Sequence, residues 1–187
     1  MIERKVQETK KFYDKYPIAD NEFRRGGSVL KSEDIQINLK ELSKKEVLDC
    51  GCGPGNISAQ LLDKVKDIKL TSLDISISSL KILKKRLKTT IKCNIIQGNV
   101  LSLPFKKEVF DFIIVAGVIH HTPKPFLALD NLNYVLKKSG KIYLSLYNKH
   151  SFYFLSFTHS VNYLDISIIE INYPIFSSLY FNFYYVK

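Results

Sequence analysis

The sequence is poor in cysteine and contains no long hydrophobic run. Its three cysteines, Cys50, Cys52 and Cys93, are odd in number, and two lie in a glycine-rich stretch, which excludes a disulfide framework. The spacing of Cys50 and Cys52 relative to His120 and His121 matches no usual zinc-finger pattern, so no metal is expected. No apolar run reaches the roughly 18 residues that a membrane-spanning helix needs, so no transmembrane segment is expected.

No secretory leader is expected either, because residues 1–11 alternate charged and amide side chains with few apolar ones. Together with the three cysteines, which are interpreted as reduced thiols, this predicts a cytoplasmic protein. The 187 residues, 45% of them hydrophobic and 25% charged, suit one α/β domain with a real core and are slightly few for two. We therefore predict a single domain over residues 1–187.

Acidic residues are scarce relative to basic ones, with 18 Asp and Glu against 28 Lys and Arg and a formal net charge of +10. Residues 151–187 hold only Lys187 against Asp165 and Glu170, so residues 1–150 carry a formal charge of +11. This asymmetry indicates an acidic partner, such as RNA, an anionic membrane or a phosphorylated substrate. The alternative is that the lysines only keep the protein soluble.

The glycine-rich stretch, residues 47–55, has the sequence VLDCGCGPG and predicts a buried strand that runs into a tight turn. Glycine tolerates positive φ and lets a ligand approach the backbone closely, so the turn predicts a nucleotide-like ligand. The G-x-G-x-x-G spacing of dinucleotide sites is absent, and Asp49 stands two positions before the first glycine. A carboxylate there disfavours a pyrophosphate and suits a ligand that carries an ammonium group.

Strands and helices alternate along the chain. The predicted strands cover residues 46–50, 69–73, 93–97, 110–115 and 141–146. Predicted helices begin at a Ser32 cap, near Asn56, at a Ser76 cap and near Phe126, and the last one ends at Gly140 as a carboxyl-terminal cap. This alternation predicts an α/β fold with a Rossmann-like, doubly wound and mainly parallel sheet. Ligands in such sheets bind at the carboxyl ends of the strands.

Five stretches in this order resemble the class I S-adenosylmethionine-dependent methyltransferases, and among them the type-11 group. They are DCGCGPGN at 49–56, LDIS at 73–76, GNVLSLPF at 98–105, FDFIIVAGVIHHTPKP at 110–125 and VLKKSGKIYLSLYN at 135–148. The resemblance implies the class I methyltransferase fold, S-adenosyl-L-methionine as cofactor and transfer of its methyl group, the activity of EC class 2.1.1.

The resemblance also implies a set of cofactor contacts. The methionine part would lie on Asp49 and on the backbone amides of Gly51, Cys52, Gly53 and Gly55. Asp74 would accept both ribose hydroxyls, and the adenosine would lie between Leu73 and Ile75. Asn99 falls where the family more often has Asp and would accept a hydrogen bond from the adenine amino group through its amide oxygen, while Val100 offers its N–H. The path to the acceptor would be lined by Ala116, Gly117 and Val118.

Methyl transfer from a sulfonium is an in-line displacement, for which alignment can supply about 7–11 kcal/mol. A general base is needed only if the acceptor is protonated, and His121 and His120 are the candidates because they titrate near neutrality. Alternatively, these histidines only cap or pack against the next helix. The aromatic segment FYDKYP at 12–17 is similar to one that covers the cofactor in some type-11 enzymes, so Tyr13 and Tyr16 are predicted lid contacts.

The predicted domain divides into an N-terminal lid segment at 1–31, a cofactor-binding core at 32–150 and an atypical tail at 151–187. The tail holds 12 of the 23 aromatic residues. It is interpreted as closing strands at 166–171 and 179–185, as an apolar surface for a homodimer partner, a membrane or an oily substrate, or as an incomplete sheet. The methyl acceptor is expected to be a small molecule or lipid-like. RNA as the acceptor and a non-catalytic binding module are the alternatives.

Overall fold

The structure is a computed structural model, and it describes residues 2–17, 38–87, 93–147 and 166–172. Its six strands are β1 (Glu46–Cys50), β2 (Lys69–Asp74), β3 (Cys93–Gln97), β4 (Phe110–Ala116), β5 (Leu136–Tyr147) and β6 (Ile166–Asn172). They form one sheet in the order β3-β2-β1-β4-β5-β6, in which the first five strands are parallel and β6 runs antiparallel to β5. The predicted doubly wound, mainly parallel α/β fold is confirmed.

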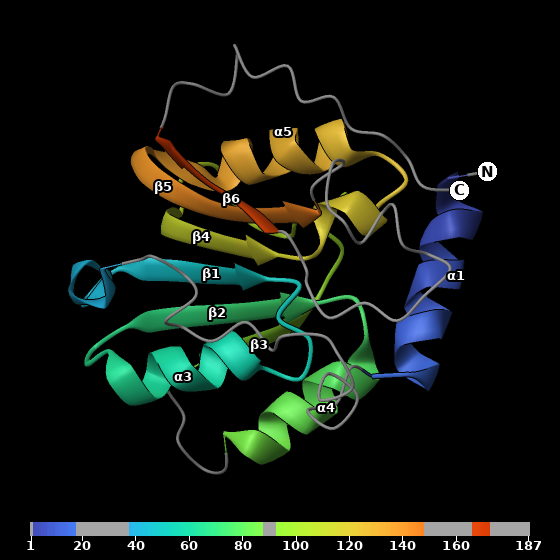
Figure 1. Cartoon of the computed structure of the whole chain (residues 1–187), viewed down its shortest axis with the longest axis horizontal. Coiled ribbons are helices and arrows are strands. Elements are labelled where there is room, and N and C mark those ends of the chain that lie inside the picture. Colours follow the sequence, from blue (N-terminus) through green and yellow to red (C-terminus); the bar gives the residue numbers. More distant parts are fainter. Residues whose placement is uncertain (1, 18–37, 88–92, 148–165, 173–187) are drawn as a thin grey trace.

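The helices are α1 (Ile2–Lys15), α3 (Asn56–Lys64), α4 (Ile77–Arg86) and α5 (Pro125–Val135), with 3-10 turns η1 (Leu39–Leu42) and η2 (Ile119–His121). Figure 1 shows α5 on one side of the sheet, α3 and α4 on the other, and α1 standing across the carboxyl ends of the strands. None of the helices among the described residues is both long enough and apolar enough to cross a membrane.

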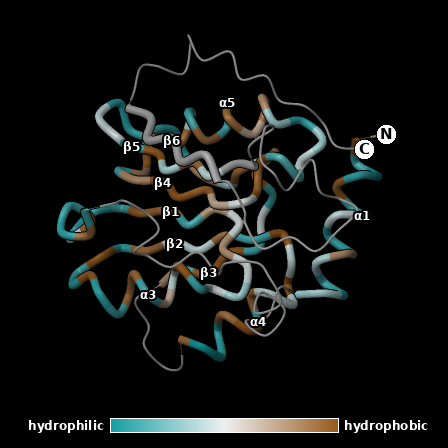
Figure 2. Tube along the Cα trace, in the orientation of Figure 1, coloured by the Kyte–Doolittle hydropathy of each residue, from teal (hydrophilic) through white to brown (hydrophobic). Residues whose placement is uncertain are grey.

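The core forms on both faces of the sheet because successive strand residues point to opposite sides. Leu48 and Ile113 pack in the cluster that includes α5, whereas their neighbours Val47 and Phe112 pack in the cluster that includes α3. β4 is therefore apolar at consecutive positions, as expected of a central parallel strand. Figure 2 shows hydrophobic residues concentrated along the strands and more hydrophilic ones on the outer sides of the helices. This packing fixes the strand ends where the site lies.

One predicted helix boundary is wrong, and another lies outside the described residues. Gly140 does not cap α5, because the helix ends at Val135 and Leu136 already has extended backbone angles (φ −77°, ψ 134°). Leu136 is fully buried and pairs with Phe110 of β4, so burial of its side chain outweighs the helical pattern around it. In the predicted helix from Ser32, residues 32–37 lie outside the described part, and the rest is the short turn η1, capped by the extended residue Asn38.

β6 confirms the predicted closing strand at 166–171, which pairs with β5 from Lys141 to Tyr147. The second predicted strand, at 179–185, and all 12 aromatic residues of the tail lie outside the described residues. The predicted lid contributes the helix α1 in the described part of segment 1–31.

Candidate functional site

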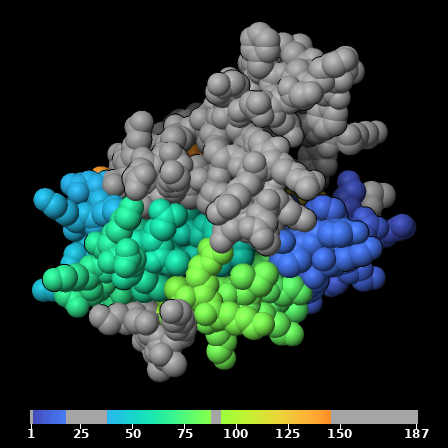
Figure 3. Space-filling model, turned by 60° about the horizontal axis from the view of Figure 1, so that its bottom comes forward, coloured from blue at the N-terminus to red at the C-terminus, as the bar shows by residue number. Residues whose placement is uncertain are grey.

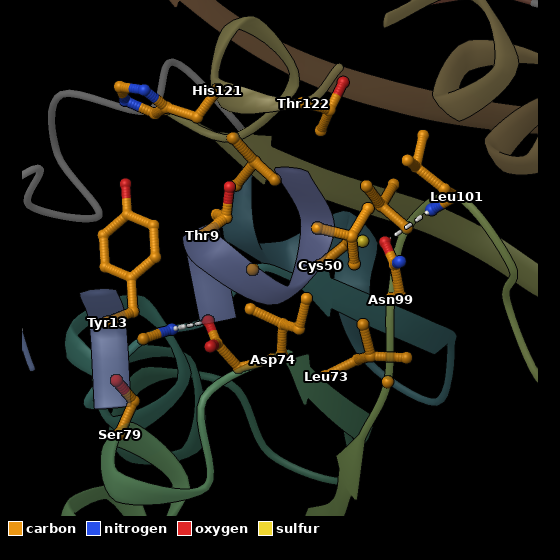
Figure 4. A pocket seen from close by; sticks show the side chains of 18 of the residues that line it. Thr9, Tyr13, Cys50, Leu73, Asp74, Ser79, Asn99, Leu101, His121 and Thr122 are labelled. Atoms are coloured by element: carbon orange, nitrogen blue, oxygen red, sulfur yellow. Dashed lines mark hydrogen bonds between the residues drawn. The ribbon is translucent and has the colours of Figure 1, made fainter. Parts of the chain in front are cut away.

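A pocket with about 850 Å³ of space between atoms, part of it open to solvent, lies at the carboxyl ends of the strands. It opens beside β1 and β4, which are neighbours although β2 and β3 lie between them in sequence. This is the switch in strand order at which open α/β sheets bind ligands. Figure 4 shows Thr9 and Tyr13 of α1 on one side, Asn99 and Leu101 on the other, and Asp74 between them.

Most of the predicted site residues line this pocket. They are Tyr13, Gly51, Gly53, Asp74, Ile75, Asn99, Val100, Ala116, Gly117 and His121, together with Leu73 and Val118. Five predicted residues are not part of the lining, namely Tyr16, Asp49, Cys52, Gly55 and His120. Sequence reasoning missed Val6, Thr9, Cys50, Ser79, Gly98, Leu101, Thr122 and Pro123. The helical spacing of Val6, Thr9 and Tyr13 could have identified the face of α1 that turns inward.

The three glycines of the turn all have positive φ, but their surroundings differ. A Cβ on Gly51 would lie 2.2 Å from a methyl group of Val118, and one on Gly55 would lie 2.1 Å from a methyl group of Leu83, so close packing excludes side chains there. Gly53 has φ +53° and nothing within 4 Å of the place of a Cβ, which leaves its surface open. Gly53 is therefore where a ligand can approach the turn most closely.

The backbone amides of the turn already have partners within the protein. Gly51 and Cys52 both donate to the carbonyl of Leu73, at 2.7 and 3.0 Å, and Gly55 donates to the carbonyl of Cys52 at 3.0 Å. Gly53 donates to Asp74 Oδ2 at 2.8 Å. In this arrangement the amides shape the turn and hold Asp74, and direct amide contacts with the cofactor remain a prediction.

Asp74 at the end of β2 is 9% exposed and held from two sides. Its Oδ2 accepts from Gly53, and its Oδ1 accepts from the N–H of Ser76 at 2.8 Å. Burial raises the pKa of Asp74, the two backbone N–H groups oppose that rise, and the charge of Asp14 adds to it. Each oxygen keeps a second lone pair, so the fixed carboxylate can still accept hydrogen bonds from vicinal hydroxyl groups.

Asn99 follows β3, and its side-chain oxygen faces the backbone of Leu101. Asn99 Oδ1 accepts from the N–H of Leu101 at 2.9 Å, and a backbone N–H can pair only with the oxygen of an amide side chain. The remaining atom, Nδ2, is a donor. The oxygen assigned from the sequence to the adenine amino group therefore already accepts one hydrogen bond, its second lone pair can still accept another, and the adenine contact remains a prediction.

Asp49 lies behind the glycine turn and is only 2% exposed. The hydroxyl of Ser58 donates to Asp49 Oδ2 at 2.6 Å, Ser58 Oγ and Ser72 Oγ are 2.7 Å apart, and Ser72 Oγ lies 3.1 Å from Cys93 Sγ. Burial raises the pKa of Asp49 to about 6, with the Ser58 hydrogen bond opposing the rise and the charge of Asp74 adding to it. Asp49 thus anchors a buried polar chain between β1, α3, β2 and β3.

The two histidines occupy different places. His121 lines the mouth with an exposed side chain, and its ring lies edge-on to Tyr13 at 6.5 Å between centroids. His120 packs against His121 at 4.2 Å between centroids and is not part of the lining. Burial, with a contribution from His121, lowers the pKa of His120 to about 3, and partial desolvation also lowers the pKa of His121. Both imidazoles are therefore neutral at pH 7, and His121 is the one placed to take a proton.

Among the described residues, no three His, Cys, Asp or Glu side chains lie close enough together to hold a metal ion. The thiols in the site are also unreactive. Cys50 lines the pocket, but burial, with the charges of Asp49 and Asp74, raises its pKa far above the ordinary value, and the pKa of Cys52 is raised in the same way.

Comparison with known proteins identifies the family. A family model described as a methyltransferase domain matches residues 48–144, more than half of the chain. Uncharacterized protein MJ0638 of Methanocaldococcus jannaschii is 33% identical over 154 residues, covering 78% of this chain and 64% of that protein. Demethylmenaquinone methyltransferase of Lactococcus lactis is 34% identical over 107 residues, covering 56% of this chain and 42% of that protein.

Among solved structures, that of the [4+2]-cyclase SpnF has a TM-score of 0.66 at 16% identity, covering 79% of this chain and 62% of that one. At this identity the match shows the fold alone. The chain spans less than two thirds of the length of each of these three relatives. The match to the family model confirms the resemblance carried by the five sequence stretches, and S-adenosylmethionine is the cofactor that the family implies. This chain belongs to the type-11 methyltransferase domain family.

Proposed function

We propose that the chain is an S-adenosylmethionine-dependent methyltransferase that methylates a small, neutral or lipid-like acceptor in the pocket beneath α1. The observation that carries the proposal is the placement of Asp74. A buried carboxylate at the carboxyl end of β2, fixed by two backbone amides, lines the pocket next to the open surface of Gly53.

The lining fits an adenosyl group. Asp74 supplies acceptors for the two ribose hydroxyls, and Leu73, Ile75 and Leu101 supply apolar walls for a flat ring. The bound cofactor would supply an electrophilic methyl group. The residues of this chain would orient the two reactants and limit the access of water. The helix α1 contributes to this because it covers one side of the pocket. Because the Cys50 thiol stays protonated, it does not compete with the acceptor for the methyl group.

The mouth of the pocket favours an uncharged acceptor. Apart from the neutral His121, the side chains there are apolar, aromatic or hydroxyl-bearing, as in Val6, Thr9, Tyr13 and Pro123. A charged acceptor would lose its hydration in this surrounding without gaining an opposite charge. A related protein of Lactococcus lactis is named a demethylmenaquinone methyltransferase, which agrees with an apolar acceptor. His121 would remove a proton where the acceptor atom carries one.

RNA is a second candidate acceptor, favoured by basic side chains on the two helices beside the pocket. The exposed ones are Arg4, Lys5, Lys11, Lys15, Lys81, Lys84 and Lys85. Phosphate binding by such groups weakens steeply as salt is added. RNA affinity that falls steeply between low and moderate salt would support this acceptor, and no RNA binding at low salt would exclude it.

The proposed function is tested by calorimetry with S-adenosylmethionine and S-adenosylhomocysteine. The wild-type chain should bind both, and Asp74→Asn should lose at least about tenfold in affinity, since hydrogen bonds to a charged group contribute about 1.5–3 kcal/mol. Asp63→Asn, at an exposed position of α3, is the matched control and should bind like the wild type. No heat and no thermal shift at millimolar ligand would refute the proposal. Methyl transfer to lipid, RNA and small-molecule fractions of an extract then identifies the acceptor class.

A further inference from the structure

The helix α1 covers the pocket without having a core of its own. None of its residues is buried; Phe12 is 56% exposed, and Tyr16, directly after the helix, is 49% exposed. It packs against α4, and Figure 1 and Figure 3 show the end of α1 next to the start of α4. A helix with so little buried apolar surface opens at a low free energy, independently of the sheet. The few contacts that hold α1 therefore decide how often the pocket is covered.

One polar joint connects the last turn of α1 to the first turn of α4, and it centres on the Ser76 hydroxyl, which lies within hydrogen-bond distance of Asp14 Oδ1 and, at 3.2 Å, of the Tyr13 carbonyl oxygen. Asp14 Oδ1 accepts from the hydroxyl of Ser76 at 2.9 Å and from the N–H of Ser78 at 3.3 Å. Ser76 is itself the N-cap of α4, where its Oγ accepts from the N–H of Ser79 at 3.1 Å. Asp14 thus acts as a second cap for α4, supplied by another helix, with its negative charge at the favourable end of the helix dipole.

The carboxylate of Asp14 is charged at neutral pH. Partial desolvation raises its pKa, but the hydrogen bonds from Ser76 and Ser78 and the charge of Lys10 lower it further, so the net shift is downward. Hydrogen bonds to a charged acceptor are stronger than neutral ones, which makes this joint the firmest polar contact described between α1 and the rest of the fold.

The same corner reaches the pocket. The N–H of Ser76 donates to Asp74 Oδ1 at 2.8 Å, while its hydroxyl donates to Asp14 on the other side. The two carboxylates repel each other across Ser76, and the charge of Asp14 contributes to the raised pKa of Asp74, after burial. A ligand in the pocket would also contact Val6, Thr9 and Tyr13 of α1, which line it. Occupation of the pocket should therefore hold α1 more firmly.

We infer that Asp14 is a positioning residue, which holds α1 through Ser76 so that Val6, Thr9 and Tyr13 close over a ligand bound at Asp74. By thermodynamic reciprocity, the ligand stabilises the closed helix as much as the closed helix stabilises the ligand. The identity of that ligand rests on the proposed function, whereas the joint between α1 and α4 does not.

The joint is tested first on the full chain without ligand, by hydrogen exchange. Asp14→Ala should raise amide exchange in residues 2–13 at least tenfold and leave β1 and β4 unchanged. Asp14→Asn, which keeps one acceptor oxygen, should restore part of the protection. Glu8→Ala is the matched control, because Glu8 lies on the same helix and pairs only with the exposed Arg4 in the described residues. Equal exchange in the wild type and Asp14→Ala would overturn the inference.

The coupling to the pocket is tested by the dissociation rate of S-adenosylhomocysteine. Dissociation should be about tenfold faster from Asp14→Ala than from the wild type and Glu8→Ala, with similar association rates. Unchanged dissociation from a variant whose α1 exchanges faster would overturn the coupling. If the wild type does not bind S-adenosylhomocysteine, the proposed function and the coupling both fail, while the exchange experiment still decides the joint.

Discussion

Replacement of Asp49 by Asn tests whether a buried carboxylate destabilises the folded protein without its ligand. Asp49 is 2% exposed and its pKa is raised from 3.8 to about 6 by burial, against the opposing hydrogen bond from Ser58. The folded state therefore holds the proton more tightly than the unfolded chain, and the free energy of unfolding falls as the pH rises from about 4 to about 6. Above pH 6 the full destabilisation is present.

The magnitude follows from the shift. About two pKa units at 1.36 kcal/mol each correspond to about 3 kcal/mol at pH 7.5, of which about half is already present at pH 5. Asn cannot ionise, so Asp49→Asn should change the difference in unfolding free energy between pH 5 and pH 7.5 by about 1.5 kcal/mol in favour of pH 7.5. Its amide N–H adds a cost of about 1–3 kcal/mol that does not depend on pH, so the pH dependence is the diagnostic quantity.

Urea unfolding of the ligand-free wild type and Asp49→Asn at both pH values measures this difference, because contributions of the other titrating groups cancel between the two proteins. Asp63→Asn, at an exposed site, should follow the wild type at both pH values. Parallel pH dependences of the wild type and Asp49→Asn would refute the reasoning and show that Asp49 ionises as easily in the folded protein as in the unfolded chain.

Three further substitutions probe the pocket. Asn99→Asp should bind S-adenosylhomocysteine about tenfold more tightly by calorimetry, because a carboxylate oxygen replaces the amide nitrogen and can accept from the adenine amino group. Unchanged affinity would contradict a contact between residue 99 and the adenine. His121→Asn should lower turnover about 10²–10⁴-fold with cofactor affinity intact if His121 is a general base, and unchanged turnover contradicts that role. Gly51→Ala should lower the free energy of unfolding in urea by about 2–5 kcal/mol, because it combines positive φ with a collision against Val118. Gly53→Ala, with open space around it, should lose only about 1–2 kcal/mol, and equal losses would contradict the collision.

The strands and the location of the site follow from the sequence because they depend on local patterns. Apolar runs such as that of β4 are readable without tertiary information, and parallel strands bring their carboxyl ends to one edge. Asp74, Asn99 and Gly117 therefore meet in the pocket as expected. The boundary at Leu136 is different, because the residue fits a helix locally and is drawn into β5 by a fully buried place beside Phe110.

Hydrogen-bond partners are the part of the site that the sequence could not predict. Residue types show that Asp49 and Asn99 can accept hydrogen bonds, but not that the Ser58 hydroxyl and the Leu101 amide already donate to them. The role of Asp14 is likewise invisible in the sequence, because its partner Ser76 is 62 residues away. Such contacts depend on how α1 and α4 meet in three dimensions.

The central claim, that the pocket beside Asp74 holds S-adenosylmethionine, is tested most directly by a crystal structure of the full chain grown with S-adenosylhomocysteine. The account predicts the ribose hydroxyls within hydrogen-bond distance of the Asp74 carboxylate, the base toward Asn99 and Val100, and α1 closed over the ligand. A ligand bound elsewhere, or an occupied pocket in which Asp74 makes no contact with the ribose, would contradict it.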